Sequence, residues 1–284
     1  MSLPPEVHSA ARVPAPPLDR YIEVLWYQRI PIYSAREVIL PSPYIELIIN
    51  FGQPHKVFTR ADLSQFDWHR DSWLAGLQSQ WLGIESSTSH MIGARLKPGG
   101  AAAFLPDDIR KLSDRVTPLD AILGAEAATL REELLAITDD EARFDVLENF
   151  LRARLDEARP GLDLALSAVA RLEAAAGDLG IGELAAILEV SHKHLIDVFT
   201  STVGLRPKQF ARVLRFASVL PDLLSDAAPD WAALAQRAGY HDQSHFNREF
   251  HDFSGLTPSQ YLELRAEYAG DYSEGDDTRF VPLG

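Results

Sequence analysis

The sequence predicts an α+β protein in which a β-rich N-terminal domain, a small barrel or sandwich with appended helices, precedes an all-α domain. Short β-branched and aromatic runs bounded by Pro or Gly fill the chain up to about residue 105. Ala, Leu, Glu and Arg at helical spacing follow, and the last part of the chain repeats itself with a period of 51 residues. At 284 residues, the chain is long enough for two domains that each bury a core.

The N-terminal domain is predicted over residues 1–160, with the barrel or sandwich at about 20–105 and helices at about 118–157. Its strands are expected at 21–30, 37–40, 44–51, 56–59, 73–78 and 90–96. Helices are expected at 119–123, 127–137 and 141–157. In the last of these, Phe144, Leu147, Leu151 and Leu155 form one apolar stripe. The stripe is either a dimer surface or a face packed on its own barrel, and we weight the two equally.

Residues 161–268 are predicted to form a helical domain after the helix-breaking Arg159-Pro160-Gly161. The repeat pairs His194 with His245, Phe199 with Phe250, Gly204 with Gly255, Leu205 with Leu256, Pro207 with Pro258 and Gln209 with Gln260. In each copy a helix, a tight turn and a second helix follow one another, with Ser191 and Asp242 as N-caps of the second helices. Residues 269–284 are interpreted as an acidic tail without assigned structure.

Such helix-turn-helix units present the outer face of their second helix to the DNA major groove. The outward residues of the first unit are His192, Lys193, His194, Ile196 and Asp197, with Thr200 and Ser201 beyond them. Those of the second are Gln243, Ser244, His245, Asn247 and Arg248, with His251 beyond. Expected phosphate contacts are Arg206, Lys208, Arg212 and Arg215. A single unit could equally be a plain packing motif, but two in tandem favour DNA binding.

Several motifs resemble the DNA-binding domain of AraC/XylS-type transcriptional regulators over about residues 161–265. They are Gly204-Leu205-x-Pro207-Lys208-x-Phe210, Ala238-Gly239-Tyr240-x-Asp242-Gln243-Ser244-His245-Phe246-x-Arg248-x-Phe250 and Gly255-x-Thr257-Pro258-x-Gln260-Tyr261. The resemblance implies two helix-turn-helix units joined by a long helix and reading successive major grooves. It also implies a cupin-like N-terminal domain for effector binding and dimerisation. Residues 73–78, 92–104 and 118–119 are similar to an N-terminal domain type of members without an assigned effector.

Three features depart from that pattern. The chain carries a formal charge of −14, and residues 161–265, with nine Lys or Arg and thirteen Asp or Glu, carry −4, which is unfavourable for binding phosphates. Asp197 stands where the family has a basic or polar contact residue, and Pro221 is expected to kink or end the linking helix. Five histidines, at 192, 194, 241, 245 and 251, raise the hypothesis of pH-sensitive binding, although surface solvation is the favoured explanation.

Composition and motifs exclude several other chemistries. Without cysteine there is no disulfide framework, thiolate metal site or cysteine nucleophile. His55, His69 and His90 are isolated, so we expect no metal, no cofactor, no catalytic residues and no enzymatic activity. The apolar runs are too short to span a membrane and the N-terminus lacks the features of a secretory signal, so a cytoplasmic location is expected. A barrel could hold a small effector, with Trp26, Tyr44, Glu46, Trp73, His90 and Arg95 as candidate lining.

The sequence therefore predicts a regulator of transcription that binds double-stranded DNA, with a small-molecule effector and RNA polymerase as candidate partners and a homodimer as the expected assembly. The alternative is a protein-interaction module with weakened DNA binding that acts through its N-terminal domain or acidic tail. Asp197 and the negative charge of the helical domain motivate this alternative.

Overall fold

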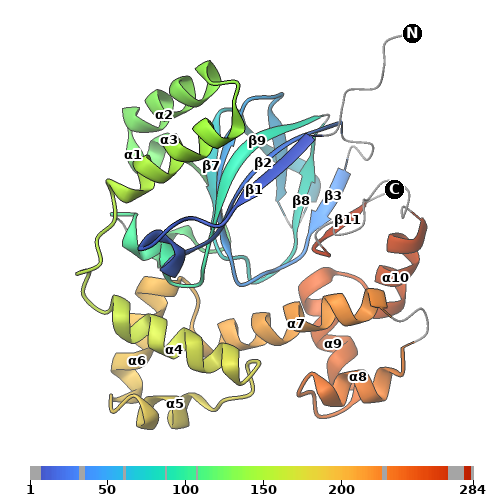
Figure 1. The fold of residues 1–284 in the computed structure, drawn as a ribbon. Helices are drawn as coiled ribbons and strands as arrows, with labels where there is room; N and C mark the ends of the chain where they lie inside the picture. Colours follow the sequence, from blue (N-terminus) through green and yellow to red (C-terminus); the bar gives the residue numbers. More distant parts are fainter. Residues whose placement is uncertain are drawn as a thin grey trace.

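The computed structural model describes residues 8–31, 36–59, 62–86, 88–106, 108–225, 229–267 and 278–282. Its N-terminal domain holds two antiparallel sheets that face one another, with helices above and a helical domain below (Figure 1). The first sheet has the order β1 (His8–Arg12), β2 (Ile22–Pro31), β9 (Thr88–Leu96), β4 (Ile45–Asn50), β7 (Ser72–Ala75) and β10 (Val116–Pro118). The second has the order β11 (Phe280–Pro282), β3 (Arg36–Ile39), β8 (Leu82–Glu85), β5 (His55–Thr59) and β6 (Asp62–His69).

Among the described strands, no ladder joins one sheet to the other, so the N-terminal domain is a sandwich and not a closed barrel. The alternating sequence of β4 shows how the first sheet is used. Ile45, Leu47 and Ile49 are buried in the main core, whereas Glu46 and Ile48 point into the space between the sheets. One face of this sheet therefore packs on helices, and the other faces a cavity.

Three helices cover the outer face of the first sheet: α1 (Asp120–Leu123), α2 (Ala125–Ala136) and α3 (Asp140–Arg152) (Figure 1). Phe144, Leu147 and Leu151 of α3 are at most 1% exposed and belong to the same core as the sheet. Of the two interpretations of this apolar stripe, packing on its own domain is the one that the structure shows. The helix ends at Arg152, five residues before the expected end at 157, and the amide of Asp156 instead donates to the carbonyl oxygen of Ala103.

The C-terminal domain is entirely helical in its described residues. It contains α4 (Leu162–Ala174), α5 (Ile181–Ile187), α6 (His192–Val203), α7 (Pro207–Ser225), α8 (Trp231–Arg237), α9 (Gln243–Ser254) and α10 (Pro258–Glu267). Both predicted N-caps are confirmed, because Ser191 accepts from the amide of His194 at 3.2 Å and Asp242 from the amide of His245 at 2.7 Å. The local sequence signals therefore locate both helix-turn-helix units.

Pro221 was expected to kink or end the linking helix. Helix α7 continues through it to Ser225, so the second of these expectations is wrong. Proline removes a single backbone donor, and the buried side chains of Leu220 and Leu223 on either side hold the helix in place. The helix therefore links the two units without a break.

The last described residues correct the expectation of a structureless tail over 269–284. Residues 280–282 form β11, which pairs antiparallel with β3 and aligns Val281 with Val38. Val281 is fully buried, and this burial of an apolar side chain stabilises the strand. Residues 269–277 and 283–284 of the predicted tail lie outside the described ranges.

Candidate nucleic-acid interface and ligand cavity

Helix α6 exposes the first-unit residues that the sequence singles out. His192, Lys193, His194 and Asp197 are exposed and Ile196 is half-buried, while Leu195 and Phe199 on the opposite face are fully buried. Thr200, which was expected to face outward, is buried, and its hydroxyl donates to the carbonyl oxygen of Ile196 at 2.6 Å. The exposed polar side chains of α6 thus lie in its first two turns, and Ser201 beyond them is half-buried.

Helix α9 repeats this arrangement. Gln243, Ser244 and Arg248 are exposed, and His245 and Asn247 are half-buried. On the inner face, the Phe246 ring lies 5.3 Å from the Tyr240 ring and 5.7 Å from the Phe250 ring, measured between centroids. The aromatic packing fixes which face of α9 points outward.

Both helices direct their C-terminal ends at the N-terminal domain. At the end of α9, the carbonyl oxygen of Phe253 accepts a hydrogen bond from the amide of Trp81 at 3.0 Å. At the end of α6, Gly204 lies against Ser113 and Ile109. The first turns, which carry the candidate base contacts, therefore lie at the ends away from the sandwich (Figure 1).

The four expected phosphate contacts separate into two pairs. Arg206 and Lys208 are exposed. Arg212 and Arg215 instead point at Glu249 of α9, with Arg212 Nε 2.9 Å from Oε2 and Arg215 Nη2 3.5 Å from Oε1. The second pair therefore fixes α9 against α7.

Sequence reasoning missed Glu249, whose side chain is 5% exposed. It lies on the inner face of α9 between Phe246, Phe250 and Phe253, where an acidic residue interrupts an otherwise aromatic stripe. That interruption is the signal that could have found it, because a buried carboxylate needs a cationic partner. Burial, with a smaller contribution from the charge of Glu249, also raises the pKa of the nearby Tyr240 hydroxyl above its ordinary value.

A cavity of about 1050 Å³ lies between the two sheets. Five of the six candidate effector contacts line it: Trp26, Tyr44, Glu46, Trp73 and Arg95. His90 is not among the lining residues, and its Nε2 lies 3.1 Å from the Tyr27 hydroxyl on the helix side of the sheet. The physical reason is the period of two along a strand, because His90 and Arg95 of β9 are an odd number of residues apart and face opposite sides.

Glu46 is the polar centre of this cavity. Its carboxylate accepts hydrogen bonds from Trp26 Nε1 at 3.1 Å, Arg95 Nε at 2.7 Å and Arg279 Nη2 at 3.3 Å. The Arg95 guanidinium also lies 5.5 Å from the centroid of the Tyr44 ring. The cavity therefore combines largely apolar walls with a cluster of charged groups at Glu46, an arrangement typical of sites for small organic ligands.

His55, also in the cavity wall, gives a pH-dependent stability. Burial, with a smaller contribution from the charge of His69, lowers the pKa of His55 from 6.5 to about 4. The unfolded chain takes up this proton below pH 6.5 and the folded chain does not, so stability is lost as the pH falls from 6.5 to 4. The shift corresponds to about 3 kcal/mol. Between pH 7 and 4, the free energy of unfolding measured in urea should therefore fall by about 3 kcal/mol less in His55→Gln than in wild type. Equal losses in both proteins would contradict this assignment.

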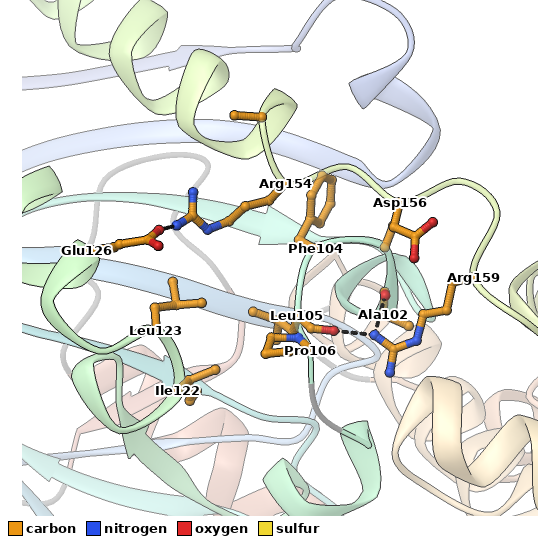
Figure 2. A pocket seen from close by; sticks show the side chains of 12 residues that line it. Ala102, Phe104, Leu105, Pro106, Ile122, Leu123, Glu126, Arg154, Asp156 and Arg159 are labelled. Carbon is orange, nitrogen blue, oxygen red and sulfur yellow. Dashed lines mark hydrogen bonds and ion pairs between the residues drawn. The ribbon is translucent and has the colours of Figure 1, made fainter.

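A second pocket, of about 790 Å³, lies where α1 and α2 meet the chain after η2 (Gly100–Ala103) (Figure 2). Phe104, Leu105, Ile122 and Leu123 supply its apolar side. Its two guanidiniums are engaged within the chain, because Arg154 pairs with Glu126 and Arg159 donates to the carbonyl oxygens of Ala102 and Leu105. These contacts fix the connection between α3 and α4 and give the pocket a structural role.

Among the described residues, no group of three or more His, Asp or Glu side chains is placed to hold a metal ion. Within the same ranges, no helix has both the length and the apolarity to cross a membrane.

Comparisons with known proteins match the two parts of the chain separately. Residues 184–264 match a family model described as "Helix-turn-helix domain", and residues 11–118 match "Domain of unknown function (DUF6597)". A curated "Uncharacterized HTH-type transcriptional regulator" of Haemophilus influenzae is 30% identical over 93 residues, which are 33% of this chain and 31% of the relative. The match thus spans about a third of that relative's length.

Solved structures with similarity include ToxT from Vibrio cholerae O395, with 10% identity over 84% of this chain and 97% of that chain and a TM-score of 0.46. Unsaturated fatty acid-bound wild-type ToxT has 11% identity over 92% and 97% of the two chains and a TM-score of 0.44. The C-terminal domain of AraT, a response regulator from Geobacillus stearothermophilus, has 26% identity over 39% of this chain and 91% of that chain, with a TM-score of 0.32.

Proposed function

We propose that this protein is a transcriptional regulator of the AraC/XylS type that binds double-stranded DNA sequence-specifically, a proposal supported by the match of residues 184–264 to a helix-turn-helix family model. In this proposal α6 and α9 enter the major groove. The exposed face of α9 carries the proposal, because Gln243 and Asn247 suit adenine and Arg248 suits guanine. Arg206 and Lys208 contact phosphates, and Arg212 and Arg215 position α9 instead.

The length of α7 supports this mode of binding. Its 19 residues span about 28 Å, close to the ~34 Å that separates successive major grooves on one face of DNA. Arg206 and Lys208 lie at its N-terminal end, just after the first recognition helix. A helix of this length, with cations beside the first unit, suits a domain that reads two grooves.

The charge pattern assigns unequal roles to the two units. In α6, Asp197 repels phosphate or accepts a hydrogen bond from the N4 amino group of cytosine, so this unit contributes less affinity than α9. Base contacts by α9 supply the specificity. The domain's negative charge lowers the overall affinity, and the phosphate contacts of Arg206 and Lys208 make the affinity fall as salt rises.

The test is selection of bound sequences from a random duplex library at about 0.1 M salt. We expect one enriched motif for wild type, and a 10- to 100-fold weaker affinity of Arg248→Ala for that motif, since a bidentate base contact is worth about 1–3 kcal/mol. Arg171→Ala, at an exposed arginine of α4, is the matched control and should bind like wild type.

Salt titration separates base contacts from phosphate contacts in the same assay. Lys208→Ala should weaken binding to all sequences alike and reduce the slope of log affinity against log salt by about 1. Absence of any enriched motif would contradict the proposal and favour the protein-interaction alternative.

We further propose that the cavity between the sheets binds a small effector that controls DNA binding, in a protein that is cytoplasmic, homodimeric and contacts RNA polymerase. The cavity supports the effector, because its largely apolar walls surround the charged cluster at Glu46. An effector acts only through different affinities for two arrangements of the DNA-binding domain.

A further inference from the structure

The described end of the chain returns from the helical domain to the sandwich. Residues 278–282 run along β3, where β11 aligns Phe280 with Ile39 and Pro282 with Glu37 (Figure 1). Before the strand, the amide of Leu40 donates to the carbonyl oxygen of Arg279 at 2.8 Å. We call residues 278–282 the strap.

One side of the strap forms part of the cavity wall. Thr278, Arg279 and Phe280 all line the cavity. The Arg279 side chain is 11% exposed, and its Nη1 donates to Ser42 Oγ at 2.7 Å while its Nη2 donates to Glu46 at 3.3 Å. The strap thus contributes a guanidinium to the charged cluster on which a ligand's polar group must depend.

The same segment is bonded to the second helix-turn-helix unit. The hydroxyl of Tyr261 in α10 donates to the carbonyl oxygen of Thr278 at 2.8 Å, and Arg265 Nη1 donates to that of Phe280 at 2.8 Å. The Tyr261 ring is fully buried and lies 5.8 Å from the ring of Phe250 in α9. A continuous set of contacts therefore runs from Glu46 through the strap to the second recognition helix.

Helix α7 provides another contact between the cavity and the DNA-binding domain, since Ala217 and Leu220 also line the cavity. Both α7 and the strap adjoin α9, one through the ion pairs of Glu249 and the other through Tyr261. The cavity wall is therefore built partly from the elements that fix the second unit.

We propose that the strap closes the cavity over an apolar ligand with one hydrogen-bond-accepting group, and that closure couples ligand binding to the placement of α9. The coupling rests on the proposed function of the cavity as the effector site. Arg279 donates to the ligand's accepting group, so the bound ligand favours the closed strap, which holds α10 and α9 in place. By thermodynamic linkage, a ligand that changes DNA affinity is itself bound more or less tightly by the same factor when DNA is present.

The experiment uses the full-length protein and the dye 1-anilinonaphthalene-8-sulfonate, an aryl sulfonate of the required class, as the probe. For wild type we expect saturable dye fluorescence, a change of at least 5-fold in affinity for the selected DNA, and slower hydrogen exchange of α9 amides when the dye is bound. Arg279→Ala should weaken dye binding about 10-fold, because a hydrogen bond from a charged donor is lost. Tyr261→Phe removes only the hydroxyl at the other end of the strap, and should keep dye affinity within 2-fold while reducing the protection of α9.

Two results would overturn the proposal. One is dye affinity that is the same in wild type as in Arg279→Ala or in a chain lacking residues 278–284, since then the strap does not help to form the site; absence of dye binding to wild type likewise overturns the proposed ligand class. The other is the same dye-induced protection of α9 in Tyr261→Phe as in wild type. DNA selection without dye distinguishes failure of the strap coupling from failure of the proposed function. An enriched motif supports DNA binding by the protein even where the strap coupling is absent.

Discussion

Replacing Glu249 by alanine is expected to destabilise the C-terminal domain by about 3–5 kcal/mol and to abolish DNA binding by the second unit. The carboxylate is 5% exposed and is paired with Arg212 and Arg215 of α7. Its removal takes the counter-charge from Arg215, whereas Arg212 keeps that of Asp252, whose Oδ2 lies 3.6 Å from Arg212 Nη2. Arg212 is 36% exposed and relaxes toward water, whereas Arg215 is 17% exposed and stays desolvated beside Tyr240. The loss therefore comes chiefly from Arg215.

Urea unfolding of the variant measures this loss, and binding to the selected DNA motif measures its consequence. Glu263→Ala, at an exposed acidic residue of α10, is the matched control and should change stability by less than about 0.5 kcal/mol. Glu249→Gln keeps the shape but not the charge, and we expect it to lose most of the same stability. A change below about 1 kcal/mol in Glu249→Ala would show that the ion pairs do not fix α9.

The same ion pairs illustrate what could be predicted from sequence. The helix-turn-helix units could be predicted from local signals. The caps Ser191 and Asp242 bond to backbone amides three residues further on, and a glycine directly follows the last residue of α6 and of α9. Arg212 and Glu249 are 37 residues apart, so no local pattern pairs them. A cluster of basic residues on one helix is therefore an unreliable indicator of phosphate contacts when an acidic residue elsewhere can bury against it.

In the N-terminal domain, strands with β-branched runs such as β4 and β9 were predicted, and β1, β6, β8, β10 and β11 were missed. Among the missed strands, β6 lies at an edge of its sheet with residues 64–68 exposed, and β11 depends on a partner, β3, that is distant in sequence. The cavity residues were found as residue types, but Arg279 was not, because it enters from the far end of the chain.

Substituting Gly204 by alanine is expected to lower the free energy of unfolding by more than the cost of the unfavourable backbone conformation alone. Gly204 has φ +106°, and a Cβ there meets Ser113 Oγ of the N-terminal domain at 2.4 Å. The unfavourable backbone costs about 1–2 kcal/mol and the contact a further 1–3 kcal/mol. Gly239→Ala is the matched control, because it has φ +75° but its Cβ meets only atoms at 3.7 Å, so we expect the backbone cost alone.

The double variant Gly204→Ala with Ser113→Gly removes the obstructing hydroxyl and should recover at least about 1 kcal/mol in urea unfolding. Equal destabilisation in Gly204→Ala and Gly239→Ala, with no recovery, would contradict a tight contact between α6 and the sandwich. The result matters for both units, because the repeat places Gly255 at the equivalent position of the second, where a Cβ meets Trp81 Nε1 at 3.0 Å. In each unit, the glycine that ends the second helix thus packs against the N-terminal domain. A change in either contact alters the placement of one recognition helix relative to the other.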